Sequence, residues 1–345
     1  MKKTPRRTTI YDIAQLADAS PSAVSSVLNG TWKKRRISVK LAERVTQVAE
    51  AQGYAVNAQA SLLRREKSNV IGMIVPKYDN RYFGQIAERF EEMARARGLF
   101  PVVTCTQRDP ELEFEAAKEL VSWQADCVIS TGATDPDRIS AFCSAAGVQS
   151  LNLDLPGTAA PSVVSDNRAG ARVLTALILD RCAAEFGTSG ALRFVGGRLS
   201  DHNSARRLEG FLEEHRARGI EVPEAHVLAT GYSADKAAAA LSGFRPTGPT
   251  GLFVNSTIAL EGVVRWLGEL GPAMDLVRYG CFDWDPFGGY LPGNVGMVEQ
   301  DVEAMLSRVL GMVGEEAPAG EVSYVPCLLR EFGADGVSPR TGQGG

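Results

Sequence analysis

The chain has 345 residues, of which 44% are hydrophobic and 23% are charged, and it carries a net charge of −4. This composition is typical of a globular protein long enough for two or three domains, and no apolar run approaches the length of a membrane span. The charge is unevenly distributed: residues 1–65 hold twelve Lys and Arg against four acidic residues, a net +8, whereas the remainder carries −12. A small basic segment on an acidic body indicates a polyanion as the partner of that segment.

Cysteine usage and the start of the chain indicate the compartment. The six cysteines are scattered, with no C-x-x-C pair and no histidine at metal-ligand spacing. We therefore expect reduced, mostly buried thiols, no metal site and no cofactor. The basic N-terminus is followed by polar helical sequence instead of the apolar core of a signal peptide, so we expect a cytoplasmic protein.

Apolar spacing predicts three short helices near the N-terminus. The first covers about 10–17 and turns Ile13, Leu16 and Ala17 to one side. The third covers about 38–52 and aligns three apolar residues, which are Leu41, Val45 and Val48. Helices this short do not persist alone in water, so all three need a shared core.

The second helix has clear start and stop signals. Ser20 is a suitable N-cap, Pro21 fits the first helical position, and Asn29 followed by Gly30 ends the helix. Only the short stretch "DAS" separates it from the first helix, which predicts a helix-turn-helix.

The second helix carries unusually small residues on one face. A helix that enters the DNA major groove must bring one face close to the base edges, and small side chains allow this. We expect Pro21, Ser22 and Ser26 to face the groove, and Ser25 to contact phosphate. The loop "TWKKRR" follows, and its four cations would bind phosphate without reading bases.

The segment "TIYDIAQLADASPSAVSSVLNG" resembles the N-terminal signature of the LacI family of bacterial transcription regulators, and the likeness runs through almost the whole chain. The six-residue loop before "ISVKLAERV" is similar to the fructose and sucrose repressor branch. The resemblance implies a helix-turn-helix DNA-binding domain over residues 1–56. Small side chains replace longer polar ones on its recognition face, so no operator sequence is predicted. The residues expected to contact DNA are Thr9, Tyr11, Pro21, Ser22, Ser25, Ser26, Asn29, Lys33, Lys34, Arg35 and Arg36.

The resemblance makes residues 57–67, which include "NAQASLLRR", a hinge helix and linker. Such a short segment should fold only when two copies pack together on DNA. Leu63 would be the apolar wedge that enters the minor groove, while Asn57 and Ala60 allow close approach. The alternative is a plain linker that carries a leucine, and Val56 stands where relatives commonly have proline.

The rest of the chain alternates buried-strand and helical patterns, which predicts a doubly wound parallel α/β fold. By resemblance it is a two-lobed, periplasmic-binding-protein-like effector and dimerisation domain over 68–345. We expect an N-lobe from 68–165 and 297–325, a C-lobe from 166–296 and 326–332, and a disordered glycine-rich tail at 333–345. Strands are predicted at 70–75, 100–105, 126–131, 148–153, 192–197, 251–255 and 277–282, and helices at 82–98, 111–124 and 257–270.

Ligands of such sheets bind at the carboxyl ends of the strands. Asp154 closes a predicted strand and is suited to accepting sugar hydroxyls, although a strand-end aspartate is also a common helix cap. Asn255 and Ser256 end another strand and would donate to hydroxyls. Gln300 falls where the chain crosses between the lobes.

Other effector-binding residues follow from the resemblance. Arg207 matches the position where the family presents an arginine to its effector, with Asn203 in the same stretch. The alternative for Arg207 is an exposed helix arginine paired with Glu209 or Glu213. Asp283 matches a strand-end carboxylate, and the adjacent Trp284 would stack on a sugar ring or belong to the core.

The effector is expected to be a sugar. In the fructose and sucrose branch an arginine typically follows the strand-end aspartate, whereas here Leu155 and Pro156 follow it, so one phosphate anchor is missing. A fructose-like sugar is the first hypothesis. A sugar phosphate, or another small metabolite, held through Arg207 and Arg198 is the second.

The sequence thus predicts a transcriptional regulator and not an enzyme. We expect a homodimeric repressor of sugar-utilisation genes on a pseudo-palindromic operator, switched by effector binding between the lobes. The sequence has no G-x-x-x-x-G-K-[ST], no G-x-G-x-x-G, and no G-x-S-x-G in a suitable setting. The alternatives are a sugar-metabolising enzyme with a DNA-binding head, a helix-turn-helix joined to an isomerase-like sensor, and a secreted sugar-binding protein.

Overall fold

The computed structural model describes residues 8–54 and 68–333, and it divides into two compact units, Met1–Ser68 and Asn69–Gly345. We call the first unit the head and the second the body. The predicted hinge helix and most of the predicted tail lie outside the described residues. Among the residues that are described, no helix combines the length and the apolar character needed to cross a membrane.

The head contains three helices, as predicted. Each begins at a side-chain cap, which satisfies backbone N–H groups that have no partner within the helix. Thr9 and Asp12 form a reciprocal capping box, while the hydroxyls of Ser20 and Ser38 accept from Ala23 N and Leu41 N. The helices are α1 (Ile10–Leu16), α2 (Pro21–Leu28) and α3 (Val39–Ala51).

A small shared core holds these three helices together. Ile13 and Ala17 of the first helix region pack with Val24 and Val45, all with 0% of their surface exposed. Leu16 departs from the prediction, since 56% of it is exposed. The buried stripe of α1 passes through positions 13, 14 and 17, and Leu16 lies outside it, beyond the edge marked by Ile13.

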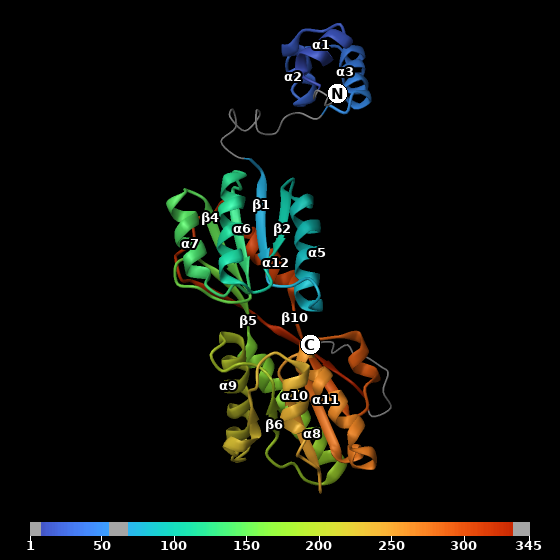
Figure 1. Ribbon diagram of the computed structural model, residues 1–345, viewed down its shortest axis with the longest axis vertical. Coiled ribbons are helices and arrows are strands. Elements are labelled where there is room, and N and C mark those ends of the chain that lie inside the picture. Colours follow the sequence, from blue (N-terminus) through green and yellow to red (C-terminus); the bar gives the residue numbers. More distant parts are fainter. Residues whose placement is uncertain (1–7, 55–67, 334–345) are drawn as a thin grey trace, which may run out of the picture. The chain divides into compact units, whose positions relative to one another are not determined.

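The N-lobe of the body is a parallel sheet between two layers of helices (Figure 1). Alternate strand residues enter two separate cores, one against α5 and α12 and the other against α6 and α7. The sheet order is β11 (Val322–Val325), β5 (Ser162–Ser165), β4 (Gln149–Leu153), β3 (Cys127–Thr131), β1 (Val70–Val75) and β2 (Phe100–Cys105), and the helices are α5 (Arg81–Ala96), α6 (Pro110–Ser122), α7 (Pro136–Ala145) and α12 (Val302–Gly311).

The C-lobe repeats this arrangement, with α8 and α9 on one face of its sheet and α10 and α11 on the other. The sheet order is β12 (Cys327–Glu331), β10 (Asn294–Gln300), β9 (Val277–Phe282), β8 (Thr250–Val254), β6 (Arg193–Val195) and β7 (Val227–Leu228), and the edge strand β12 is antiparallel to β10. The helices are α8 (Asn167–Phe186), α9 (His202–Ala217), α10 (Ala234–Leu241) and α11 (Thr257–Glu269), with short 3₁₀ helices η1 (Glu224–His226), η2 (Gly271–Leu276) and η3 (Pro286–Tyr290).

Three segments connect the lobes, and we call them the crossovers. They lie between β5 and α8, between β10 and α12, and between β11 and β12. Figure 1 shows β5 and β10 where the two lobes meet. One predicted boundary is corrected here: residues 297–300 were expected in the N-lobe, but they pair with β9 and β12 as the end of a C-lobe strand. The chain therefore crosses only after Gln300.

Candidate functional site

A cleft of about 200 Å³ lies between the two lobes of the body. It faces the carboxyl ends of strands in both sheets, where parallel α/β folds place their ligands. The N-lobe contributes Lys77, Asn80, Tyr82, Phe83, Arg108, Asp154 and Leu155, and the C-lobe contributes Arg198, Asp201, Asn203, Arg207, Tyr232, Ser256, Ile258, Asp283 and Gln300.

Asp154 follows β4 and joins the two lobes. Its backbone is left-handed (φ 73°), which is uncommon for a residue other than glycine and turns its carboxylate into the cleft. Its Oδ1 accepts from Tyr82 Oη at 3.0 Å and from Asn203 Nδ2, across the cleft, also at 3.0 Å. Burial raises the pKa of this carboxyl to about 6, although the positive charge of Arg108 opposes the increase.

Arg207 projects from α9 and is 3% exposed. Its Nε donates to Asn167 Oδ1 at 2.7 Å, its Nη1 donates to the carbonyl of Asn255 at 2.6 Å, and the guanidinium lies 3.8 Å from the centre of the Phe282 ring. A surface pairing therefore does not describe Arg207. The neighbouring Arg206 makes the pair with Glu209, at 2.7 Å.

Asp283 and Gln300 lie at the ends of adjacent strands. Asp283 also has a left-handed backbone (φ 70°), and its Oδ1 accepts from Gln300 Nε2 at 2.6 Å and lies 3.5 Å from Arg207 Nη2. Among the described residues, Gln300 Oε1 and Asn255 Oδ1 are buried without a hydrogen-bond partner. Buried acceptors of this kind are costly when unpaired, so a ligand hydroxyl that donates to them would be favoured.

The structure brings most of the predicted effector residues together. Asp154, Asn203, Arg207, Ser256, Asp283 and Gln300 all line the cleft. Asn255 lies beside them, bonded to Arg207 through its carbonyl. Ser256 also caps α11, since its hydroxyl accepts from Ala259 N. Trp284 does not line the cleft, and 37% of it is exposed.

Sequence reasoning missed several lining residues, among them Tyr82, Arg108 and Tyr232. Arg108 and its neighbour Gln107 both have left-handed backbones, with φ of 59° and 56°. The Arg108 guanidinium lies 5.6 Å from the centre of the Phe83 ring and 5.9 Å from that of Tyr232, which is on the other lobe. Because these contacts depend on how the lobes pack, no local motif marks the three residues.

The head presents its predicted DNA-contact residues in two ways. Pro21, Ser22, Tyr11 and the four cations of the "KKRR" stretch are exposed. Thr9, Ser25 and Asn29 are half-buried and engaged locally: Thr9 is the cap of α1, and Asn29 Nδ2 donates to the Ser25 carbonyl at 2.8 Å.

One predicted contact on α2 is corrected. Ser26 is 6% exposed, and its hydroxyl donates to the Ser22 carbonyl at 2.8 Å. It belongs to the same buried side of α2 as Val27 and cannot face a groove. Asn57, Ala60 and Leu63 lie outside the described residues.

Family comparisons match both units. Residues 9–57 match the family of bacterial regulatory proteins of the lacI type, and residues 71–287 match a periplasmic binding protein domain. The fold class predicted from the sequence is thereby confirmed.

Similar proteins include two operon repressors. The chain is 64% identical over 193 residues to the "Ribitol operon repressor" of Klebsiella aerogenes, covering 56% of this chain and 72% of that protein. It is 27% identical over 344 residues to the "Sucrose operon repressor" of Klebsiella pneumoniae, covering 94% and 98% of the two chains.

Among solved structures, the lac repressor dimer bound to operator and the anti-inducer ONPF is similar, with a TM-score of 0.75 and 22% identity over 94% of this chain and 98% of that one. At this identity the likeness concerns the fold. The matched relatives are regulators and not enzymes. With its helix-turn-helix head, its two-lobed body and these matches, the chain belongs to the lacI family of bacterial regulatory proteins.

Proposed function

We propose that this chain represses a polyol or sugar operon and binds operator DNA as a homodimer. A small effector in the cleft would raise or lower its affinity for the operator. The proposed effector is a pentitol of the ribitol type, or the ketopentose formed when such a pentitol is oxidised. The observation that carries this proposal is the 64% identity to a protein named for a ribitol operon, against 27% for one named for sucrose. A fructose-like sugar remains the second neutral candidate.

The cleft supports a small, neutral, hydroxyl-rich effector. At about 200 Å³ it is smaller than the roughly 300–1,000 Å³ typical of sites for larger ligands. Carboxylates at Asp154 and Asp283 and the free acceptor of Gln300 suit hydroxyl donors, while Arg207 and Asn203 supply N–H groups. Alternating acceptors and donors match a chain of adjacent hydroxyls.

One observation favours a second candidate, an anionic effector such as a sugar phosphate. Lys77, Arg108 and Arg198 line the cleft, and none of them forms an ion pair with a carboxylate of the described residues. Cations that lack a carboxylate partner beside a cleft attract anions. Arg198 was already the anchor suggested for phosphate by the sequence.

The DNA-binding role assigned to the head rests on its exposed cations and slim recognition face. We infer that Lys33, Lys34, Arg35 and Arg36 contact phosphate, while Pro21 and Ser22 approach the bases. The hinge contacts of Asn57, Ala60 and Leu63 remain predictions. Effector binding would shift the balance between two lobe arrangements, and DNA affinity would follow.

The test combines footprinting on the DNA flanking the gene with calorimetry. Ribitol, its ketopentose, fructose and fructose 1-phosphate should be titrated separately, and each repeated with operator present. We expect a protected inverted repeat whose affinity changes with ribitol or the ketopentose. A heat of binding with fructose 1-phosphate alone would favour the second candidate. The absence of a protected inverted repeat under every condition would refute the proposal.

Arg207→Ala tests the cleft itself, with Arg206→Ala as its matched control on the same helix. Arg207→Ala should lower effector affinity by at least tenfold, because it removes a buried guanidinium that donates toward the ligand. Operator binding without effector should persist. Equal effector affinity in the two variants would show that Arg207 does not bind the effector.

A further inference from the structure

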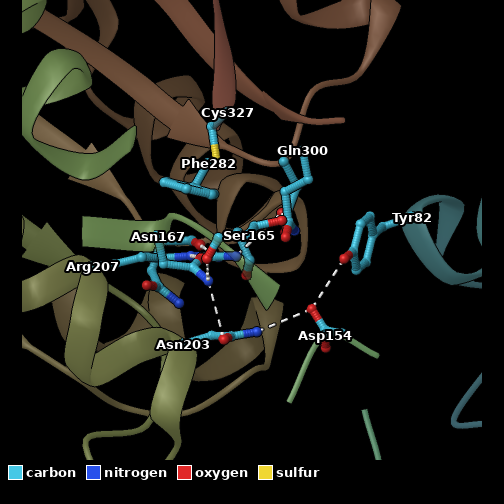
Figure 2. Close-up of polar contacts among 12 residues, drawn as sticks. Tyr82, Asp154, Ser165, Asn167, Asn203, Arg207, Phe282, Gln300 and Cys327 are labelled. Carbon is cyan, nitrogen blue, oxygen red and sulfur yellow. Dashed lines mark hydrogen bonds and ion pairs between the residues drawn. The ribbon is translucent and has the colours of Figure 1, made fainter. Parts of the chain in front are cut away.

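A continuous chain of hydrogen bonds crosses the cleft and joins residues from both lobes (Figure 2). It has six links between seven side chains. In order these are Gln300 to Asp283 (2.6 Å), Asp283 to Arg207 (3.5 Å), Arg207 to Asn167 (2.7 Å), Asn167 to Asn203 (3.1 Å), Asn203 to Asp154 (3.0 Å) and Asp154 to Tyr82 (3.0 Å). We call this chain the relay.

Six of the seven relay residues line the cleft, and Asn167 is the exception. It is the first residue of α8, directly after the β5 crossover, and it is 2% exposed. Its amide makes three bonds. Oδ1 accepts from Arg207 Nε, and Nδ2 donates both to Asn203 Oδ1 and to the Ser165 carbonyl at 3.1 Å.

The two halves of this amide are not interchangeable. The oxygen serves Arg207 and the nitrogen serves Asn203, so each ligand-facing side chain is oriented by a different atom of one planar group. The third bond fixes that group to the backbone of the crossover at Ser165. A ligand that shifts the side chain of Arg207 or Asn203 would therefore also disturb the Asn167 amide and its hydrogen bond to the Ser165 carbonyl.

Ser165, the last residue of β5 before this crossover, also contacts a helix of the N-lobe. Ser165 Oγ lies 3.1 Å from the Met305 sulfur on α12, and Tyr82 Oη lies 3.8 Å from the same sulfur. Figure 2 shows Ser165 and Asn167 next to Arg207, with Tyr82 on the far side of Asp154. Tyr82, at one end of the relay, and Ser165, to which its centre is bonded, thus both contact α12, the helix that follows the β10 crossover.

We propose that Asn167 is the positioning residue that couples occupation of the cleft to the crossover between the lobes. It does not contact the effector itself. Its three hydrogen bonds fix the side chains of Arg207 and Asn203 relative to the backbone of Ser165. This inference rests on the proposed function for its ligand-dependent part. It identifies where effector binding is converted into a change in lobe arrangement.

The test compares Asn167→Asp and Asn167→Ala with Asn152→Ala. Asn167→Asp keeps the acceptor for Arg207 but removes both donors, whereas Asn167→Ala removes all three bonds. Asn152 is the matched control, because it is also a fully buried amide, bonded to Ser130 and Ser162, and it does not line the cleft. The measured quantity is the factor by which saturating ribitol or its ketopentose changes the operator Kd.

Both Asn167 variants should reduce this factor to within about twofold of one while retaining operator binding without effector. Asn152→Ala should keep the wild-type factor even if its melting temperature falls. A wild-type factor in folded Asn167→Ala would overturn the inference. A wild-type protein that responds to neither compound would instead count against the proposed effector.

A second arm needs no ligand. The two substitutions are Tyr82→Phe and Arg207→Lys. They lie on different sides of Asn203 in the relay, and the Tyr82 and Arg207 side chains do not hydrogen-bond each other. Their effects on melting temperature should be non-additive when Asn167 is present and additive in the Asn167→Ala background, since distant changes add unless a network couples them. Additivity in both backgrounds would overturn the inference regardless of the effector.

Discussion

At the scale of single residues, Asp154 shows how one carboxylate serves both binding and lobe contact. It is 3% exposed and accepts hydrogen bonds from both lobes, yet burial works against its charge and raises its pKa to about 6. A native pKa above that of the unfolded chain means that the folded state binds the proton more tightly. The stabilisation from this proton is present at low pH and is lost as pH rises through about 6.

Replacing Asp154 with asparagine should therefore have opposite effects on stability and binding. Asp154→Asn should raise the free energy of unfolding at pH 7 by on the order of 1–3 kcal/mol, because the buried charge is removed. The gain should shrink as pH falls from about 6 towards 4. Chemical denaturation at several pH values measures this, and a gain that is constant with pH would contradict it.

The same titration bears on the effector. Wild-type affinity should fall as pH decreases through about 6, since a protonated Asp154 is a weaker acceptor for hydroxyls. Asp154→Asn should bind more weakly at pH 7 but without this pH dependence. Calorimetry in buffers of equal ionic strength distinguishes the two profiles.

At the scale of elements, α8 and α9 approach each other through a glycine. A Cβ built on Gly210 of α9 would lie 2.1 Å from the Arg168 carbonyl of α8, a contact that backbone atoms cannot relieve cheaply. Gly210 is therefore needed for close helix packing and not for an unusual backbone conformation. This matters for the site, because α9 carries Asn203 and Arg207.

Gly210→Ala should destabilise the body by roughly 1–3 kcal/mol through this overlap. The matched control is Gly268→Ala in α11, where the added Cβ meets nothing within 4 Å. That change should stabilise by up to about 1 kcal/mol, because alanine is the better helix former. Thermal unfolding of the two variants should move in opposite directions, and equal shifts would contradict the packing argument.

At the scale of the whole molecule, an ion pair outside the effector cleft also bridges the lobes. Arg81, the first residue of α5, places its Nε 2.8 Å from Asp285 Oδ2, just before η3 of the other lobe. Arg81 is 55% exposed in its side chain, so the pair contributes little to stability. Its effect should instead appear in the balance between lobe arrangements.

Arg81→Ala should weaken effector binding by no more than about fivefold at low salt, and the difference should vanish near 1 M salt, where exposed charges are screened. Arg89→Ala on the same helix is the control, because its pair with Glu92 lies within one element. Calorimetry at two salt concentrations suffices. A salt-independent loss would show that Arg81 acts by another route.

The charge division between the head and the body predicts how DNA binding responds to salt. Neutralising Lys34 or Arg35 should weaken binding to operator and non-operator DNA alike, and each removed cation should reduce the slope of log K against log salt by about one. Ser22→Ala should affect operator binding alone, because Ser22 faces the bases in the proposed arrangement. Fluorescence anisotropy on both duplexes, at several salt concentrations, would reveal any departure from this division.

Much of the fold could be predicted because its signals are local. The caps at Ser20 and Ser38, the proline at the start of α2 and the apolar spacing of the strands act over a few residues, and the three head helices and seven predicted strands were found on that basis. Leu16 and Ser26 were misplaced, because a short helix leaves the edges of its buried stripe to be settled by its neighbours.

The sequence by itself determined the helix-turn-helix head, the alternation of strands and helices, and the strand ends at which ligands bind. Only the tertiary structure decided that Tyr82, Asn167 and Arg108 belong with Asp154 and Arg207, and that the chain crosses between lobes after Gln300. The physical reason is the distance along the chain over which each kind of interaction acts. Caps and periodicity act over one or two turns, whereas the bonds of the relay join residues up to 76 positions apart. One of these bonds, from Asn203 to Asp154, exists only because the two lobes meet.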